Sequence, residues 1–248
     1  MPTAVIEGLN VNYVVKGSGP HLLMLAPGGF NSIIEKWGGG VWGEMDALNS
    51  LAQHFTLIAY DRREAGASGG RVEKLTWAHF ARQGHALLDH LGVDKFFVMG
   101  FCIGNPLIWN LLQRAPGRIV AAVSAQPSGV DPKNPKWFYN SNIKGWAPKL
   151  IASRPEINMG MVERFLEKMY GNVDFVLTAT RDFVRNCHTP LLVLPDDTEA
   201  HVYAVAMEMV HLAPNAQVSL YPWKDTRQHT AMAVRHVRSF LRANCPAA

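Results

Sequence analysis

The sequence has few charged residues for its length. Charged residues make up 18% of the 248 positions, against about 25% in an average globular protein. Hydrophobic residues make up 48%, which excludes a disordered chain, since disorder requires high charge and few apolar residues. The net charge is +4, but the basic residues are spread along the chain without a run. This scatter argues against a dedicated nucleic-acid binder.

Cysteine is also scarce. Cys102, Cys187 and Cys245 are too few and too scattered for a disulfide framework, and they suit a reducing compartment. The start of the chain, residues 1–4, lacks the basic and apolar segments of a signal peptide. No stretch approaches the ~20 apolar residues of a membrane span. We therefore expect a cytoplasmic protein whose partner is a small-molecule substrate, with no nucleic acid and no membrane; the sequence leaves open whether it forms a homodimer.

Short apolar runs alternate with amphipathic segments along the chain. This alternation predicts an α/β fold, with a mostly parallel central sheet and helices on both faces. The later runs are almost continuously apolar, as strands buried on both faces are. Strands are expected at 11–15, 21–26, 55–61, 96–101, 119–125, 190–196 and 217–223, and helices at 76–91, 103–114, 203–212 and 230–242. The first two strands are separated by Gly and Pro breakers and predict a hairpin.

One segment interrupts this alternation. Residues 127–188 contain no convincing strand, but they include several Pro and Trp residues and a helical pattern at 161–170. Because long irregular loops are uncommon in compact domains, we interpret 127–188 as an inserted helical cap. The core would then comprise residues 1–126 and 189–248.

The strongest chemical signal is Gly100-Phe101-Cys102-Ile103-Gly104, which ends a predicted strand and opens a predicted helix. A sharp strand-to-helix turn needs small residues two positions before and after its apex, and it presents the apex side chain as a nucleophile. The helix N-terminus favours thiolate over thiol at Cys102. The alternative is an inert buried cysteine, but the strand and helix on either side favour a nucleophile.

With these residues the chain resembles the α/β-hydrolase superfamily over nearly its whole length. Residues 25–30 are similar to the family's oxyanion loop, with Ala26 where His is usual. Residues 60–68 are similar to the D-x-R-G-x-G-x-S turn, with Glu64 in place of the first Gly. A cysteine in place of the usual serine is similar to dienelactone hydrolases and polyester-processing relatives. The resemblance implies the α/β-hydrolase fold with a cap.

The resemblance also implies an oxyanion hole. Its donors would be the backbone N–H groups of Ile103 and of Phe30, or alternatively Gly29. The aromatic residues of the cap and of the segment after the oxyanion loop would line a mostly apolar pocket. These residues are Trp137, Phe138, Tyr139, Trp146, Trp37 and Trp42.

The catalytic acid and base have two candidates each. The family's acid follows the strand expected at 190–196, and we favour Asp197 over Asp196. The family's base follows the last strand, where His229 is the only histidine in the loop. His201, in the loop of the acid, is the rival, and we place His229 slightly ahead.

These residues predict a hydrolase of a small, mostly apolar carboxylic ester, lactone or thioester. Cys102 would form an acyl-enzyme, which water activated by the histidine would hydrolyse. Alternatives are an acyltransferase, a C–C bond hydrolase, or a non-catalytic binding protein with a degenerate triad. We expect no cofactor and no metal, because no histidine pair has an acidic partner at metal-ligand spacing.

Overall fold

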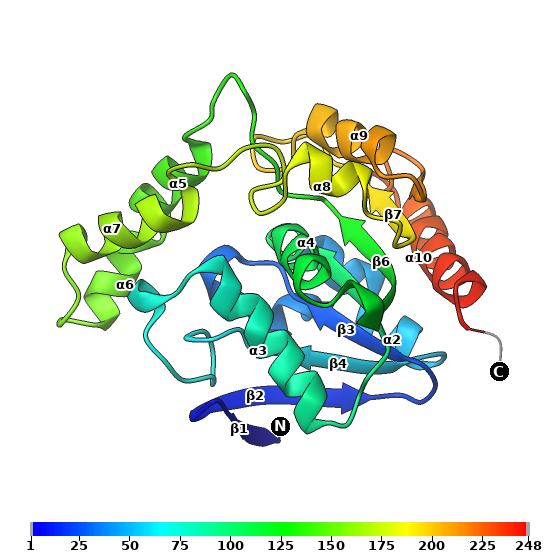
Figure 1. Cartoon of the computed structure of the whole chain (residues 1–248), viewed down its shortest axis with the longest axis horizontal. Helices are drawn as coiled ribbons and strands as arrows, with labels where there is room; N and C mark the ends of the chain where they lie inside the picture. The colour runs from blue at the N-terminus through cyan, green and yellow to red at the C-terminus, as the bar shows by residue number, and fades with distance from the viewer. Residues whose placement is uncertain (1, 247–248) are drawn as a thin grey trace.

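A sheet of eight strands forms the centre of the molecule, in the order β1-β2-β4-β3-β5-β6-β7-β8 (Figure 1). The computed structural model describes residues 2–246. The strands from β4 to β8 in this order run parallel to one another, whereas β1 and β2 are antiparallel additions at one edge. The strands are β1 (Thr3–Ile6), β2 (Leu9–Lys16), β3 (His21–Leu25), β4 (Thr56–Tyr60), β5 (Phe96–Phe101), β6 (Ile119–Ala125), β7 (Leu191–Leu194) and β8 (Ala216–Val218).

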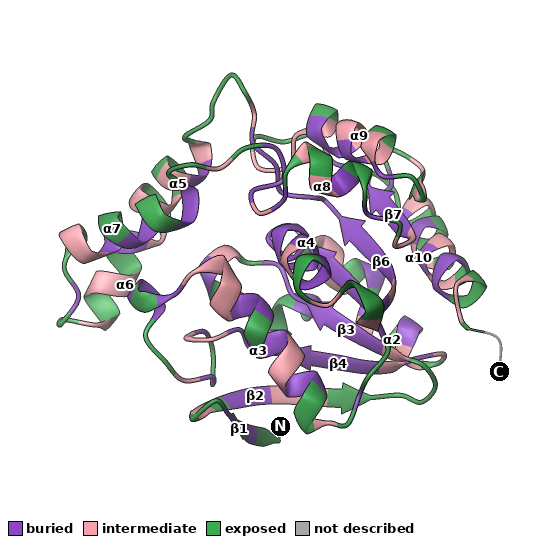
Figure 2. Cartoon of the chain, viewed as in Figure 1, coloured by how far each residue is buried: buried purple, intermediate pink, exposed green. Residues whose placement is uncertain are grey.

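Helices cover both faces of this sheet, and each face has its own hydrophobic core. Every residue of β5 and β7 is buried, which explains their continuous apolar sequence (Figure 2). One face carries α3 (Trp77–His90), α4 (Gly104–Arg114), α8 (Arg181–Arg185) and α9 (Tyr203–Leu212); the other carries α1 (Gly40–Met45), α2 (Ala47–Ala52) and α10 (Arg227–Ala243). The predicted fold class is confirmed. Within residues 2–246, no helix combines the length and apolar character that a bilayer crossing needs.

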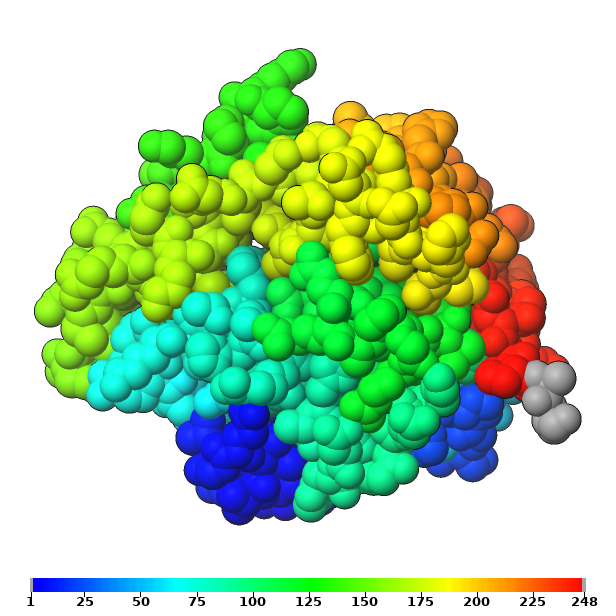
Figure 3. All heavy atoms as spheres, viewed as in Figure 1, coloured from blue at the N-terminus to red at the C-terminus, as the bar shows by residue number. Residues whose placement is uncertain are grey.

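The segment between β6 and β7 is helical. It contains α5 (Trp137–Gly145), α6 (Ala147–Ser153), α7 (Met159–Tyr170) and α8. Helices α5, α6 and α7 form a group set apart from the sheet in Figure 1. The chain from α7 to α8, yellow-green in Figure 3, then runs along the upper side of the molecule toward α9. These helices occupy the segment interpreted as a cap; the division into core and cap stays a prediction.

The predicted hairpin of residues 11–15 and 21–26 is wrong. Strand β4 lies between β2 and β3, so that Tyr13 faces Tyr60 while Leu22 faces Leu57. Strand β3 pairs with parallel partners on both of its edges. These pairings leave no edge of β3 for β2, which adds to the far side of β4.

The last strand is shorter than predicted. Pairing ends at Val218, although the apolar sequence continues to Trp223. Trp223 is fully buried and its indole N–H donates to the carbonyl oxygen of Pro195 at 2.7 Å. Trp223 therefore fills the core from a loop rather than from a strand.

Candidate active site

Cys102 stands at a sharp turn between β5 and α4. Its φ angle is +53°, a left-handed conformation that costs a non-glycine residue about 1–3 kcal/mol. Its N–H donates to the carbonyl oxygen of Ala125 at 3.0 Å, which ties the turn to the end of β6. A Cβ at Gly100 would lie 2.9 Å from the carbonyl carbon of Gly104, and one at Gly104 would lie 3.0 Å from the carbonyl oxygen of Leu25. Both glycines are thus required by the close approach of strand and helix.

The Cys102 thiol is free and partly buried. The Ser128 hydroxyl donates to its Sγ atom over 3.6 Å. Burial acts to raise the pKa of the thiol, whereas hydrogen bonding and charge from His201 act to lower it. Hydrogen bonds from the Ser128 hydroxyl and the Ile103 backbone N–H act in the same direction, so the pKa lies below its ordinary value. The surroundings therefore favour the thiolate.

His201 is joined to Asp196 in the loop after β7. The two residues contact through Nδ1 and Oδ2 at 3.2 Å, and their side chains are only 14% and 5% exposed. Thr198 lies 3.0 Å from the same Nδ1 atom. The Nε2 atom is buried, and the ring acts on the Cys102 thiol through a hydrogen bond and through its charge. Because Asp196 holds Nδ1, Nε2 is the ring nitrogen left for the hydrogen bond with the Cys102 thiol.

The ionised forms of Cys102, His201 and Asp196 stabilise one another. Burial acts to lower the pKa of His201, but hydrogen bonds to Asp196 and Cys102 raise it to about 9. Burial also acts to raise the pKa of Asp196, yet hydrogen bonds from His201 and Lys224 hold it well below its usual range. At neutral pH the arrangement therefore favours a Cys102 thiolate beside a His201 imidazolium, with an Asp196 carboxylate behind it.

The loop after β3 lies beside this turn, because β3 and β5 are parallel neighbours with Leu25 opposite Gly100. Gly28 and Gly29 have φ angles of +112° and +61°, which glycine adopts without a steric penalty. The next residue, Phe30, is buried against aromatic rings of the inserted helices. Its ring centroid lies 4.6 Å from Trp146, 4.9 Å from Phe165 and 5.8 Å from Tyr170.

The arrangement of strand, sharp turn and helix can be compared with known families. A family described as "alpha/beta hydrolase fold" matches residues 21–188, which include the Cys102 turn, the Phe30 loop and the helices α5 to α8. The chain belongs to the α/β-hydrolase fold family.

Known members of similar sequence or fold include several hydrolases. A soluble epoxide hydrolase of Corynebacterium sp. (strain C12) is 27% identical over 176 residues, covering 66% of this chain and 57% of that protein. The chain spans 32% to 57% of the length of the curated relatives it matches. Membership of the family, with hydrolases among these relatives, supports the prediction that this α/β-hydrolase fold protein is an enzyme.

Solved structures agree in fold. A meta-cleavage product hydrolase from Pseudomonas fluorescens IP01 superposes with a TM-score of 0.71 at 17% identity, covering 99% of this chain and 98% of that one. An enol-lactonase from Burkholderia xenovorans LB400 gives 0.70 at 16% identity, covering 97% and 100%. At such low identity the likeness concerns the fold alone.

The structure places the other histidine and aspartate candidates elsewhere. His229 lies in the first turn of α10, 39% exposed, with Nδ1 at 2.6 Å from Asp225 Oδ1 and 3.0 Å from the Pro222 carbonyl oxygen. Cys102 is not among its partners in residues 2–246. Asp197 is exposed, in contrast to buried Asp196. The geometry therefore brings His201 and Asp196 to Cys102 and does not bring His229 or Asp197 there.

Three polar residues join the site without having been predicted. Gln126 and Ser128 follow β6 directly, and Lys224 follows β8. The Gln126 side-chain amide donates to Asp196 Oδ2 at 2.5 Å, and Lys224 donates to the same oxygen at 2.6 Å. Their positions carried a signal, because the ends of parallel strands gather at one edge of the sheet.

The tryptophans divide between the two cores. Trp146 packs with Phe30, as expected for a pocket aromatic. Trp37 and Trp42 instead pack edge-on against Phe101, at 5.2 and 4.3 Å between ring centroids, in the core on the α10 face. The prediction that Trp37 and Trp42 line the pocket is therefore wrong, because the chain after the oxyanion loop turns toward the opposite face of the sheet.

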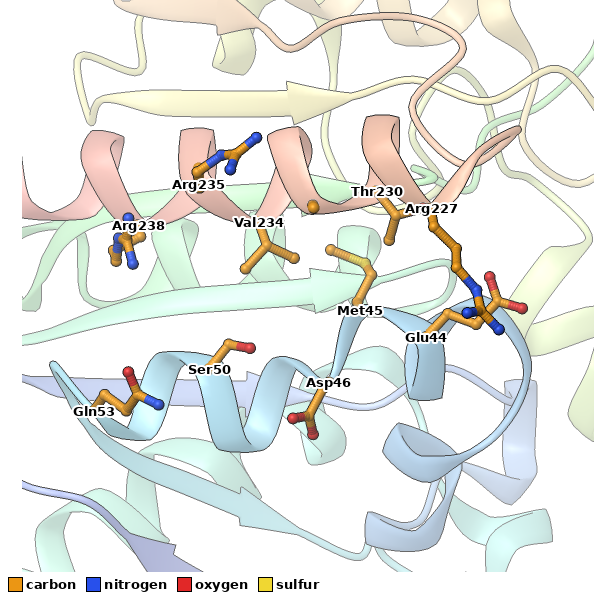
Figure 4. Close-up of a pocket in the computed structure, with 11 residues that line it drawn as sticks. Glu44, Met45, Asp46, Ser50, Gln53, Arg227, Thr230, Val234, Arg235 and Arg238 are labelled. Atoms are coloured by element: carbon orange, nitrogen blue, oxygen red, sulfur yellow. The ribbon is translucent and has the colours of Figure 1, made fainter.

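A surface groove lies between α10 and the helices α1 and α2 (Figure 4). Arg227, Arg235 and Arg238 on α10 line it opposite Glu44 and Asp46. None of the residues around Cys102 contributes to it. This groove is thus separate from the candidate active site.

Proposed function

We propose that the chain is a hydrolase of carboxylic esters, thioesters or lactones that uses Cys102 as nucleophile, His201 as acid and base, and Asp196 as the group that orients His201. The observation that carries this proposal is the buried Asp196–His201 pair, in which Asp196 holds Nδ1 and the ring acts on the Cys102 thiol by hydrogen bonding and charge. Nucleophilic catalysis requires this order of contacts: a nucleophile, a base, and a third group that orients the base.

In the first half of the reaction, the Cys102 thiolate attacks the carbonyl carbon and a C–S bond forms. The resulting oxyanion accepts hydrogen bonds from the backbone N–H groups of Ile103 and Phe30. The intermediate then collapses and expels the alcohol oxygen, which takes its proton from the His201 imidazolium. A thioester on Cys102 and a neutral His201 remain.

In the second half, neutral His201 removes a proton from water, whose oxygen attacks the thioester carbonyl. The C–S bond breaks, the acid product leaves, and the thiolate and imidazolium are restored. Because the thiolate is a good leaving group, the tetrahedral intermediate collapses back to the ester and the thiolate unless the alcohol is a good leaving group too. We therefore expect activated or strained acyl groups as substrates in preference to plain amides.

Intact-protein mass spectrometry during turnover of an activated ester tests the proposal. We expect an acyl adduct on Cys102, and loss of both adduct and turnover in Cys102→Ala. Cys245→Ala is the matched control, because that thiol donates to the Leu241 carbonyl in α10 and lies outside the site. Full turnover in Cys102→Ala would refute the assignment. Appearance of free acid indicates hydrolysis, whereas transfer of the acyl group to an added alcohol indicates an acyltransferase.

A further inference from the structure

Arg62 is a buried cation without a partner. It is the second residue after β4 and is only 2% exposed. All three of its guanidinium nitrogens are buried without a hydrogen bond, and no ion pair in residues 2–246 includes it. Its neighbour Asp61 is engaged by Asn12 and by the backbone N–H groups of Ile34 and Ala67. A buried charge that is neither paired nor hydrogen-bonded is costly, so native proteins almost always supply a partner.

The surroundings of Arg62 are aromatic. Its guanidinium carbon lies 4.6 Å from the ring centroid of Phe80 and 5.9 Å from that of Phe30. Cation–π contacts of this kind hold a guanidinium in place but leave its N–H donors unused. Burial lowers the pKa of Arg62 to about 10, with Tyr170, Tyr60 and Cys102 acting to raise it. The side chain therefore stays charged at neutral pH, and no carboxylate is among the groups that act on it.

Arg62 also lies close to the reacting groups. Phe30, beside it, belongs to the loop whose N–H faces the proposed oxyanion, and Tyr170 packs on Phe30 at 5.8 Å. β4 and β3 are parallel neighbours, so the residues that follow them emerge at the same edge of the sheet as Cys102. A group bound to Arg62 would thus be part of the molecule whose acyl carbon meets Cys102.

We propose that Arg62 binds a carboxylate of the substrate, so that the enzyme acts on acyl compounds that carry a second, free carboxylate. The planar fork of N–H donors matches a carboxylate in a bidentate geometry. Among the groups that surround it in this aromatic setting, Arg62 is the one cation. Its single positive charge therefore favours a carboxylate, with one negative charge, over a phosphate dianion. This inference rests on the proposed function, since the same site holds both groups.

The test compares two matched sets of para-nitrophenyl esters. One set contains the half-esters of succinic, glutaric and adipic acid, and the other contains the same compounds with the free carboxylate capped as a methyl ester. For at least one chain length, we expect kcat/KM of the wild type to favour the free carboxylate by about 10- to 100-fold, the range that charged hydrogen bonds provide. Arg62→Met should remove this preference and Arg62→Lys should retain part of it.

Arg82→Met is the control, because Arg82 is exposed and paired with Glu7 at 2.8 Å. It should leave the preference unchanged. Equal turnover of free and capped esters by the wild type at every chain length would overturn the inference while the proposed function stands. A second outcome would also overturn the inference: Arg62→Met keeps the carboxylate preference but loses the alkylation of Cys102 by iodoacetamide near pH 6. Arg62 would then act as a counter-ion of the thiolate.

A binding measurement separates the two proposals. In Cys102→Ala, which cannot form the acyl-enzyme, monomethyl glutarate should raise the Tm while dimethyl glutarate should not. The same shift should disappear in the Cys102→Ala, Arg62→Met double variant. If the wild type turns over no ester but the shift is present, the hydrolase proposal fails and carboxylate binding stands. If neither turnover nor a shift is seen, both fail.

Discussion

Two aspartate–histidine pairs lie after the last two strands of the sheet, and they differ in what surrounds them. The side chains of Asp196 and His201 are only 5% and 14% exposed, and His201 acts on the Cys102 thiol by hydrogen bonding and charge. Asp225 and His229 have the shorter contact, 2.6 Å against 3.2 Å, but both are more than one-third exposed. Only the first pair adjoins the candidate nucleophile.

The difference indicates that a hydrogen-bonded aspartate–histidine pair is not by itself sufficient ground to propose a base. In the exposed pair, water screens the charges and competes for both side chains, so the contact contributes little. In the buried pair, each charge is stabilised mainly by its protein neighbours. The pKa of His201 is therefore raised to about 9. Its ring is held by Asp196 so that it can exchange a proton with groups reacting at the Cys102 sulfur.

The largest expected difference between the two pairs concerns catalysis by the histidines. His201→Ala should lower kcat/KM for an activated ester by about 10³-fold, within the range of general acid–base catalysis. His229→Ala should change it less than about twofold, because an exposed side chain outside the site is lost. Steady-state kinetics on both variants measure this directly. The reverse ranking would move the base to α10 and break the comparison.

The aspartates should differ less than the histidines. Asp196→Asn keeps the shape but removes the charge that stabilises the imidazolium, so we expect a loss of about 10²-fold in kcat/KM. Asp225→Asn should have almost no effect on the same constant. Asp197→Asn provides a second control next to the site, since its side chain is exposed. A large loss in Asp197→Asn together with none in Asp196→Asn would contradict the assignment.

The pH dependence of Cys102 alkylation should sharpen the comparison further. The pKa of the thiol is lowered and that of His201 is raised to about 9, so thiolate and imidazolium coexist at pH values between the two. Near pH 6, iodoacetamide should therefore react with Cys102 at least about tenfold faster in the wild type than in His201→Ala, where the thiol regains a pKa nearer 8.5. His229→Ala should react like the wild type. Equal rates in wild type and His201→Ala would exclude the ion pair.

The smallest effect should be on stability. Removing the exposed contact by Asp225→Ala should lower the free energy of unfolding by less than about 1 kcal/mol. Thermal unfolding at low and high salt measures it, and the difference from wild type should shrink with added salt. A loss well above this value would mean that the exposed pair stabilises the start of α10 more strongly than its solvent contact allows.

The fold and the Cys102 turn could be predicted because their signals are local. Continuous apolar strands, alternating helices and the two glycines around Cys102 each reflect the packing of near neighbours in the chain. The glycines are explained by approaches of 2.9 and 3.0 Å that any Cβ would create. The place of β4 between β2 and β3 could not be predicted, because it depends on residues about forty positions beyond the end of β2.

The choice between the histidines could not be made from sequence either. It depends on a short turn in which Thr198 and His201 exchange backbone hydrogen bonds of 3.1 Å in both directions. This turn folds His201 back onto Asp196, five residues earlier, and toward the end of β5. Spacing relative to the strands favours His229 and Asp197, but the turn and the burial of this loop bring His201, held by Asp196, to the Cys102 thiol instead.

The packing of Phe30 links two parts of the molecule that could otherwise move separately. Its ring packs against Trp146, Phe165 and Tyr170 of the inserted helices, while its backbone belongs to the loop beside Cys102. Under the proposed function, a displacement of α7 would therefore act on the residue proposed to hold the oxyanion, so that the position of these helices and that of the Phe30 N–H group would be coupled.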